Sequence, residues 1–172
     1  MKKFTALLIV FSTLVHAALK VDSFKSKFVQ QITDDQNKTI RYEGELIFKA
    51  PNLTLWRYVK PIRKSVVIDG SKMILVEPEL EQVTISDFDK KQNLITLLKR
   101  AKKIGKNRYL VTVEKRDFYI VTDDKGIIRS IRYKDDLAND VKIDFLDPKQ
   151  NVEVDGSVFE IKIPANYDRI YR

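Results

Sequence analysis

Neighbouring carboxylates are the residues best suited by type to chemistry, because one can act as a general acid while the other acts as a base. The chain has three such pairs, Asp34-Asp35, Asp123-Asp124 and Asp135-Asp136. Each pair lies close to Asn, Lys or Gly, which is the composition of an exposed turn. We interpret the pairs as solvated turns and expect no catalytic role for them.

Other catalytic side chains are almost absent. The 172 residues contain no cysteine, and the single histidine, His16, lies in a segment that we expect to be removed. The mature chain then lacks the common zinc ligands and the base of every Ser-His or Cys-His pair. It also lacks a Gly-rich phosphate loop and a calcium-loop pattern. The sequence therefore predicts a protein that is not an enzyme, with no catalytic, cofactor-binding or metal-binding residues and no cofactor.

The N-terminus has the pattern of a secretory signal peptide. A basic start, "MKK", is followed by the apolar run "FTALLIVFSTLV" and by "VHA", a small-residue cleavage site. The run is about a dozen residues long, whereas a membrane-spanning helix needs about 20. We predict that residues 1–17 are removed after Ala17 and that residues 18–172 form a single exported, soluble domain. This domain has no cysteine that could accept a lipid.

Two segments have the apolar periodicity of amphipathic helices. In the first, from Leu19 to Thr33, the apolar residues at helical spacing are Val21, Phe24, Phe28 and Ile32. In the second, "NLITLLKRAKKI", one side is lined by Leu94, Leu97, Leu98, Ala101 and Ile104. The remaining side of the second helix is basic, with Lys99, Arg100, Lys102 and Lys103. We therefore expect one helix before the first strand and one inserted later.

The rest of the chain consists of short segments rich in strand-forming residues. Alternation places Trp56 and Tyr58 on one face, opposite Arg57, and it does the same for Val141, Ile143 and Phe145. Three turns are predicted to form hairpins, at Asp69-Gly70, Asp124-Lys125-Gly126 and Asp155-Gly156. We count roughly ten strands and predict a mainly β fold with helices.

Such a sheet can close on itself, or it can curl and bury its concave face beneath helices. The two amphipathic helices favour the second arrangement. An inner face more apolar than the helices can fill would leave a cavity for an apolar ligand. The pattern alone also allows a packed core.

The basic residues from Lys99 to Lys103 would suit an anionic membrane, an acidic partner or simply solvent. Nucleic acid is not expected as a partner, because the chain is exported and acidic residues are spread along it.

Four motifs follow one another between about residues 20 and 86. They are "FKSKFVQQI", with Phe24, Phe28 and Gln30; "GELIFKAPNLTLWRY"; "KP" followed by "VVIDG"; and "EPELEQVTI", which contains Gln82, Val83 and Thr84. In this order the motifs resemble those of LolA, a family of periplasmic lipoprotein carriers. The later strands resemble the family only in pattern.

The resemblance implies an incomplete antiparallel β-barrel, like that of LolA and LolB, whose open side is covered by amphipathic lid helices. It also implies a non-catalytic periplasmic chaperone that works as a monomer without a cofactor. Its partners would be lipoproteins, held by their acyl chains, an inner-membrane ABC transporter of the LolCDE type, and an outer-membrane acceptor, LolB or a substitute.

We combine the resemblance with the alternation of the strands to predict a binding site. The residues expected to line the acyl-chain cavity are Leu46, Phe48, Trp56, Tyr58, Ile68, Met73 and Leu75. The expected lid contacts are Phe24, Phe28, Leu94, Leu97 and Leu98. These assignments are hypotheses about a shared apolar face.

The chain departs from the family pattern at Ala50. An arginine commonly stands there in the family and is thought to hold the lid, whereas alanine has no side-chain donor. A latch would have to come from another group, such as Lys49, Arg57 or Arg63, or be absent. Two other functions remain open, namely a carrier of another amphiphile (a glycolipid or a free lipid) and a periplasmic sensor or scaffold that binds a protein.

Overall fold

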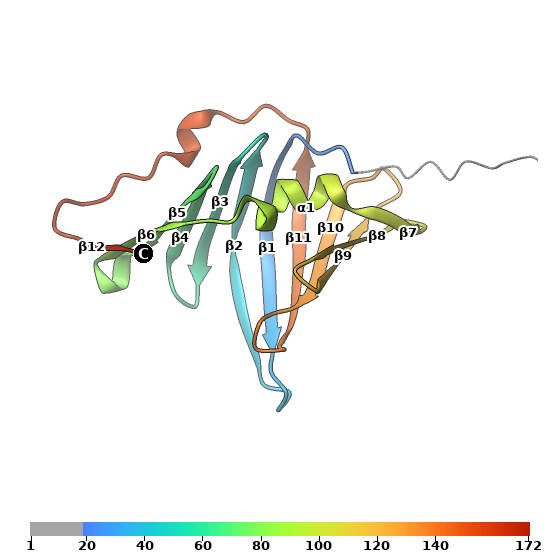
Figure 1. Ribbon diagram of the computed structural model, residues 1–172, viewed down its shortest axis with the longest axis horizontal. Coiled ribbons are helices and arrows are strands. Elements are labelled where there is room, and N and C mark those ends of the chain that lie inside the picture. Colours follow the sequence, from blue (N-terminus) through green and yellow to red (C-terminus); the bar gives the residue numbers. More distant parts are fainter. Residues whose placement is uncertain (1–18) are drawn as a thin grey trace, which may run out of the picture.

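A single curled sheet forms the body of the molecule (Figure 1). The computed structural model describes residues 19–172, so the predicted signal peptide lies outside the described residues. Within that range the order of strands across the sheet is β12-β6-β5-β4-β3-β2-β1-β11-β10-β9-β8-β7. Strands β12 and β7 form its two edges, so the sheet curls without closing. The predicted fold class is confirmed, with twelve strands where roughly ten were expected.

The strands are β1 Ser23–Thr33, β2 Thr39–Lys49, β3 Leu53–Lys60, β4 Lys64–Asp69, β5 Lys72–Glu77, β6 Gln82–Asp87, β7 Lys102–Gly105, β8 Arg108–Val113, β9 Arg116–Thr122, β10 Ile128–Lys134, β11 Asp140–Gln150 and β12 Asp168–Tyr171. The helices of residues 19–172 are α1 Leu94–Arg100 and three short 3-10 helices, η1 Pro78–Leu80, η2 Lys90–Gln92 and η3 Gly156–Phe159. Neighbouring strands pair antiparallel, except that β12 pairs with β6 in parallel. None of the helices among residues 19–172 is both long and apolar enough to span a membrane.

The helix predicted from Leu19 to Thr33 is wrong, because this segment contains strand β1 at the centre of the sheet. Phe24, Phe28 and Ile32 are four residues apart, a spacing that fits one face of a helix and equally one face of a strand. The positions between them decide the matter. Ser26 and Gln30 are buried on the same face as the phenylalanines, so the burial pattern has a period of two.

The second predicted helix is correct over its first half only. Helix α1 begins after Asn93, whose side chain accepts a hydrogen bond from the Ile95 N–H at 2.9 Å, and it ends at Arg100. Residues Lys102–Gly105 then form edge strand β7, which pairs with β8. Ile104 is consequently half exposed, and the basic residues are divided between a helix end and a strand. Neither Gly nor Pro marks this boundary in the sequence, so pairing with β8 decides it.

Two of the three predicted hairpins are confirmed. Gly70 joins β4 to β5 and Gly126 joins β9 to β10, both at positive φ, where glycine has no steric penalty. The third prediction is wrong, because Asp155 caps η3 by accepting a hydrogen bond from the Ser157 N–H at 3.0 Å.

The acidic pairs lie in turns, as predicted. The first carboxylate of each pair accepts backbone N–H bonds from its own turn, namely Asp34, Asp123 and Asp135. The N–H of Ile127, assisted by Arg129, holds the pKa of Asp123 below its usual value. These bonds stabilise tight turns.

The segment between β11 and β12 covers part of the outer face of the sheet. Val154 and Phe159 pack there against Ile47, Leu55 and Val67, which point away from α1. In Figure 1 the same segment passes above the upper ends of β2, β3 and β4 before β12 joins the edge of the sheet. Both faces of β2–β4 are therefore apolar, and the inner face carries the candidate site.

Candidate functional site

The inner face is built from rows of side chains in neighbouring strands. One row contains Phe24, Phe48, Thr54, Ile68 and Met73, each paired in register with the next. The next row towards the β3–β4 turn contains Ser26, Leu46, Trp56, Val66 and Leu75. A third row contains Phe28, Gly44 and Tyr58. The period of two along each strand thus gathers aromatic and aliphatic side chains on one surface.

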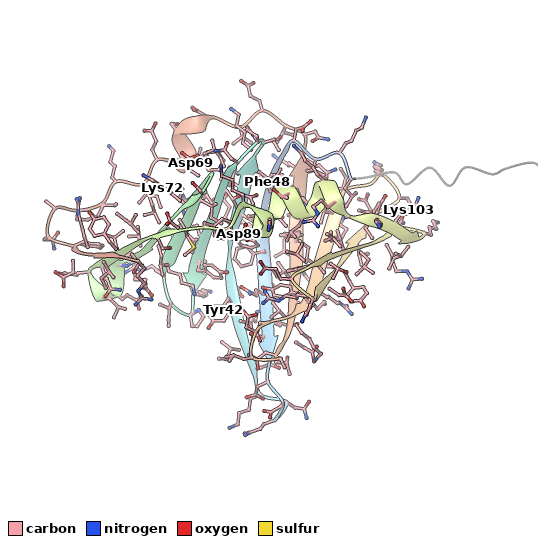
Figure 2. All side chains as sticks on the ribbon, in the orientation of Figure 1. Tyr42, Phe48, Asp69, Lys72, Asp89 and Lys103 are labelled. Carbon is pink, nitrogen blue, oxygen red and sulfur yellow. The ribbon has the colours of Figure 1, made fainter. Side chains whose placement is uncertain are left out.

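Aromatic contacts close one end of this surface. The rings of Phe24 and Phe48 stack with centroids 5.4 Å apart, and Phe145 meets Phe24 edge-on at 5.0 Å. Phe24 and Phe48 are each 1% exposed. Figure 2 shows Phe48 near the level of α1 and Tyr42 farther along the same strand, towards the opposite end of the sheet. This end is therefore packed core.

A cavity of about 310 Å³ lies beyond that core, between the sheet and α1. Ten of its lining residues are apolar: Trp56, Val66, Ile68, Phe88, Leu94, Leu97, Val113, Phe118, Ile131 and Ile143. Six are polar or hydroxylated: Gln30, Thr54, Tyr58, Glu114, Arg116 and Tyr133. An apolar hollow with a few polar groups has the character of a ligand pocket.

Helix α1 covers the cavity by apolar contact. Leu94 and Leu97 line the cavity, while Ile95 and Leu98 are 1% and 0% exposed in the main core. Burying a side chain of this kind contributes about 1.5–3 kcal/mol. In Figure 1 the helix crosses in front of the central strands. Its position is that of a cover held by three buried side chains, Ile95, Leu97 and Leu98.

Polar groups on the inner face are bonded to one another or buried. The Tyr58 hydroxyl donates to Gln30 Oε1 at 3.0 Å, and burial raises the pKa of Tyr58 far above its usual value. Burial also raises the pKa of Tyr133. Both phenols therefore stay neutral at any physiological pH. Among the described residues, the buried Thr54 hydroxyl has no hydrogen-bond partner.

The comparisons with known proteins decide the family. Residues 19–125 match the family model described as "Outer membrane lipoprotein carrier protein LolA". The outer-membrane lipoprotein carrier protein of Wolinella succinogenes is 32% identical over 152 residues, which cover 88% of each chain. This chain belongs to the LolA family. The Campylobacter jejuni protein of the same description is also 32% identical, over 97% of each chain.

One solved structure extends the comparison to the fold. A conserved protein of Thermus thermophilus, described as uncharacterized, matches this LolA-family chain with a TM-score of 0.55 and 9% identity. The match covers 88% of this chain and 91% of the other. The similarity therefore concerns the fold alone.

The predicted cavity residues of this LolA-family chain fall into three groups. Trp56, Tyr58 and Ile68 line the cavity. Leu46 and Phe48 lie on the same face but are fully buried in the core. Met73 and Leu75 are half-buried on β5, in the rows that contain Ile68 and Val66. Their assignment to acyl chains stays a hypothesis.

The predicted lid contacts come from two different elements. Leu94, Leu97 and Leu98 lie on α1. Phe24 and Phe28 lie on β1, and Phe28 meets the rings of Trp56 and Tyr58 edge-on, each at 5.2 Å. The phenylalanines therefore form part of the surface that α1 covers.

Sequence reasoning missed the half of the cavity formed by the later strands. Val113, Phe118, Ile131 and Tyr133 line it from β8, β9 and β10, and Phe88 lines it from the segment after β6. The alternation of these strands is the signal that indicates their apolar face. It predicts that Val141, Ile143 and Phe145 share one face, but only the curl of the sheet brings Ile143 and Trp56 to the same cavity.

In this LolA-family chain, the three possible substitutes for a latch arginine form their bonds away from α1. Lys49 donates to the Val154 carbonyl at 2.8 Å on the outer face. Arg57 pairs with Glu45 at 3.1 Å, and Arg63 pairs with Glu79 at 3.7 Å. None of these bonds reaches α1. Ala50 itself packs against the main core.

Proposed function

We propose that this protein carries lipoproteins between membranes by binding their acyl chains in the cavity beneath α1. The observation that supports this most directly is an apolar cavity between α1 and the sheet in a chain of the LolA family. Each methylene that leaves water gains about 0.8 kcal/mol, so even a partly enclosed acyl chain is strongly favoured over a free one.

The cavity beneath α1 is small for this cargo, at the lower end of the roughly 300–1,000 Å³ of typical ligand pockets. Acyl chains would therefore displace α1. Exposing Ile95, Leu97 and Leu98 costs about 5–9 kcal/mol, an upper bound that about six to eleven buried methylenes would offset. A ligand that buries more methylenes than this would hold α1 open, and transfer of its chains to an acceptor would let α1 close again.

The wider pathway is part of the same proposal. The protein would be exported by its signal peptide and would act in the periplasm as a non-catalytic monomer. It would receive lipoproteins from an ABC transporter of the LolCDE type and deliver them to an outer-membrane acceptor, LolB or a substitute. The names of its relatives and the family it belongs to support lipoproteins as cargo.

Trp56 provides the test, because it is the only tryptophan and lines the cavity. Titration with a synthetic tripalmitoylated cysteinyl peptide should change its fluorescence saturably, whereas the same peptide without acyl chains should not. Depletion of the protein in cells should strand lipoproteins at the inner membrane. An unchanged Trp56 signal together with normal lipoprotein sorting would contradict the proposal.

A carrier of a single-chain amphiphile is the second candidate, favoured by the small volume of the cavity beneath α1. A lysophospholipid titrated against Trp56 distinguishes the two. Binding of the lysophospholipid, with no response to the lipopeptide and normal lipoprotein sorting, would support this second function.

A further inference from the structure

A second, polar hollow of about 850 Å³ adjoins the cavity. It extends over the β8–β9 and β10–β11 turns to outward-facing residues of β1, β10 and β11. The two hollows share three lining residues, Glu114, Arg116 and Tyr133. We call the second hollow the rim groove.

Arg116 lies at the boundary between the two hollows. Its guanidinium carbon lies 6.0 Å from the centre of the Phe118 ring, and it forms an ion pair with Asp136 of the β10–β11 turn. Phe118 in turn packs on Tyr133, with ring centroids 4.9 Å apart. An apolar wall therefore supports a cation where the apolar surface ends and the polar surface begins.

The two ends of the cavity differ in polarity. The stacked rings of Phe24 and Phe48 fill one end. Most of the polar lining residues lie at the other end, where Gln30 and Tyr133 lie in the second half of their strands, beside the β1–β2 and β10–β11 turns. A ligand with an apolar part in the cavity would place its polar part at this second end.

We propose that the rim groove binds the polypeptide of an acylated ligand whose acyl chains occupy the cavity. This inference rests on the proposed function and assigns the route that the peptide follows from the mouth of the cavity. The groove presents cations (Lys115, Arg132, Lys134, Lys142) and anions (Asp117, Asp135, Asp136, Asp140) in equal number. Lys134 pairs with Asp140 and Lys142 with Asp144, but an ammonium has three N–H donors and a carboxylate has two acceptor oxygens. These groups can therefore still form hydrogen bonds with a peptide backbone of any sequence, whereas a site for phosphate would be cationic.

Arg116 has a separate role at the junction. An acylated cysteine carries ester and amide carbonyls between its chains and its peptide, and these accept hydrogen bonds. The guanidinium has five N–H donors, and those not used by Asp136 can reach carbonyls at the cavity mouth. Arg116 thereby positions the polar linkage of the ligand.

A pair of cysteine variants tests the route, because the chain has no native cysteine. Lys115 lies in the β8–β9 turn and lines the rim groove, while Lys125 lies in the β9–β10 turn. The two turns are at opposite ends of β9, about 20 Å apart. The probe is a tripalmitoylated cysteinyl peptide with a maleimide on its third residue. Bound in the groove, it should label Lys115→Cys at least about tenfold faster than Lys125→Cys, because tethering raises the local concentration.

The comparison between variants separates the inference from the proposed function. The peptide without acyl chains should label both cysteines at similar rates. Preferential labelling of Lys125→Cys, or equal labelling, while Trp56 fluorescence reports bound lipopeptide would overturn the route but leave the carrier function intact. Absence of a Trp56 response would overturn both.

Arg116→Gln tests the junction. The variant should bind the lipopeptide about tenfold more weakly, because a charged donor to the linkage is lost. Binding of a purely aromatic hydrocarbon probe should not change. Arg129→Gln is the matched control, since Arg129 pairs with Asp123 in the distant β9–β10 turn. If Arg116→Gln weakens the binding of both ligands equally, or weakens the binding of neither, Arg116 does not have this role.

Discussion

At the residue scale, Gly44 shows how closely the inner face is packed. It lies in register between Phe28 and Tyr58, and a Cβ there would overlap the Arg57 carbonyl and lie 2.7 Å from Phe28 Cζ. The absence of a side chain lets the Phe28 ring lie over the strand and reach Trp56. Glycine is therefore required at this position by space and not by a positive φ.

We predict that Gly44→Ala lowers the free energy of unfolding by about 1–3 kcal/mol, because the added carbon forces backbone or ring displacement. Urea denaturation measures the change. Gly156→Ala is the control, since a Cβ there has nothing within 4 Å, and it should change stability by less than about 0.5 kcal/mol. Similar effects of the two substitutions would show that Gly44 is not closely packed.

Thr54 is the polar exception near the core end of the cavity. Its hydroxyl is fully buried without a partner among the described residues, a condition that costs about 1–3 kcal/mol. Thr54→Val should therefore keep or raise the free energy of unfolding. Thr112→Val should lower it, because the Thr112 hydroxyl donates to Asp117. A clear loss of stability in Thr54→Val would indicate that its hydroxyl has a bonding partner in solution.

At the scale of elements, α1 is a two-turn cover whose start depends on one side chain. Asn93 is 3% exposed and caps the helix through the Ile95 N–H. A helix this short is marginal on its own, so it depends on its cap and on its contacts with the sheet. Weakening the cap should favour opening of the cover over unfolding of the sheet.

Asn93→Ala should destabilise α1 by about 1 kcal/mol. Hydrogen exchange should then speed up about fivefold at the α1 amides and much less at those of β1 and β2. Asn93→Ser is the matched control, because serine retains a capping oxygen and brings no charge to this buried position. A uniform increase across the sheet, or equal exchange in the two variants, would contradict an independently opening cover.

At the scale of the whole molecule, the curl of the sheet makes two distant groups of strands share one cavity. Val66 on β4 and Ile131 on β10 line it together, although they come from opposite halves of the sheet. A ligand bound there contacts both halves. It should therefore stabilise the entire fold rather than one hairpin.

We predict that the tripalmitoylated peptide at 100 times its dissociation constant raises the free energy of unfolding by about 2.7 kcal/mol. Thermal denaturation reports this as a higher Tm. Val66→Phe fills part of the cavity and should reduce the shift strongly, whereas Val59→Phe, on an exposed part of the neighbouring strand, should retain it. Equal shifts in both variants would place the ligand outside the cavity.

The sequence by itself determined much of this protein. Alternating apolar residues, two Asp-Gly or Asp-x-Gly turns and the motifs from Phe24 to Thr84 were enough to predict the curled sheet, the family and the apolar face around Trp56. These features are local, because the period of a strand and the φ of a turn depend on neighbouring residues. For the same reason α1 was predicted, as the first half of the second expected helix.

Only the tertiary structure decided the rest. The spacing of Phe24 and Phe28 fits a helix or a strand, and the hydrogen bonds of β2 and β11 on either side make it a strand. Likewise pairing with β8 makes Lys102–Gly105 a strand and not the end of the predicted helix. Strand β6 pairs with β12, whose residues come 86 positions later in the chain. The apolar surface of "LIFKAPNLTLWRY" becomes a cavity only when Phe118, Ile131 and Ile143 close over it. Such contacts join residues far apart in sequence, and no local pattern encodes which distant strand will curl to meet which.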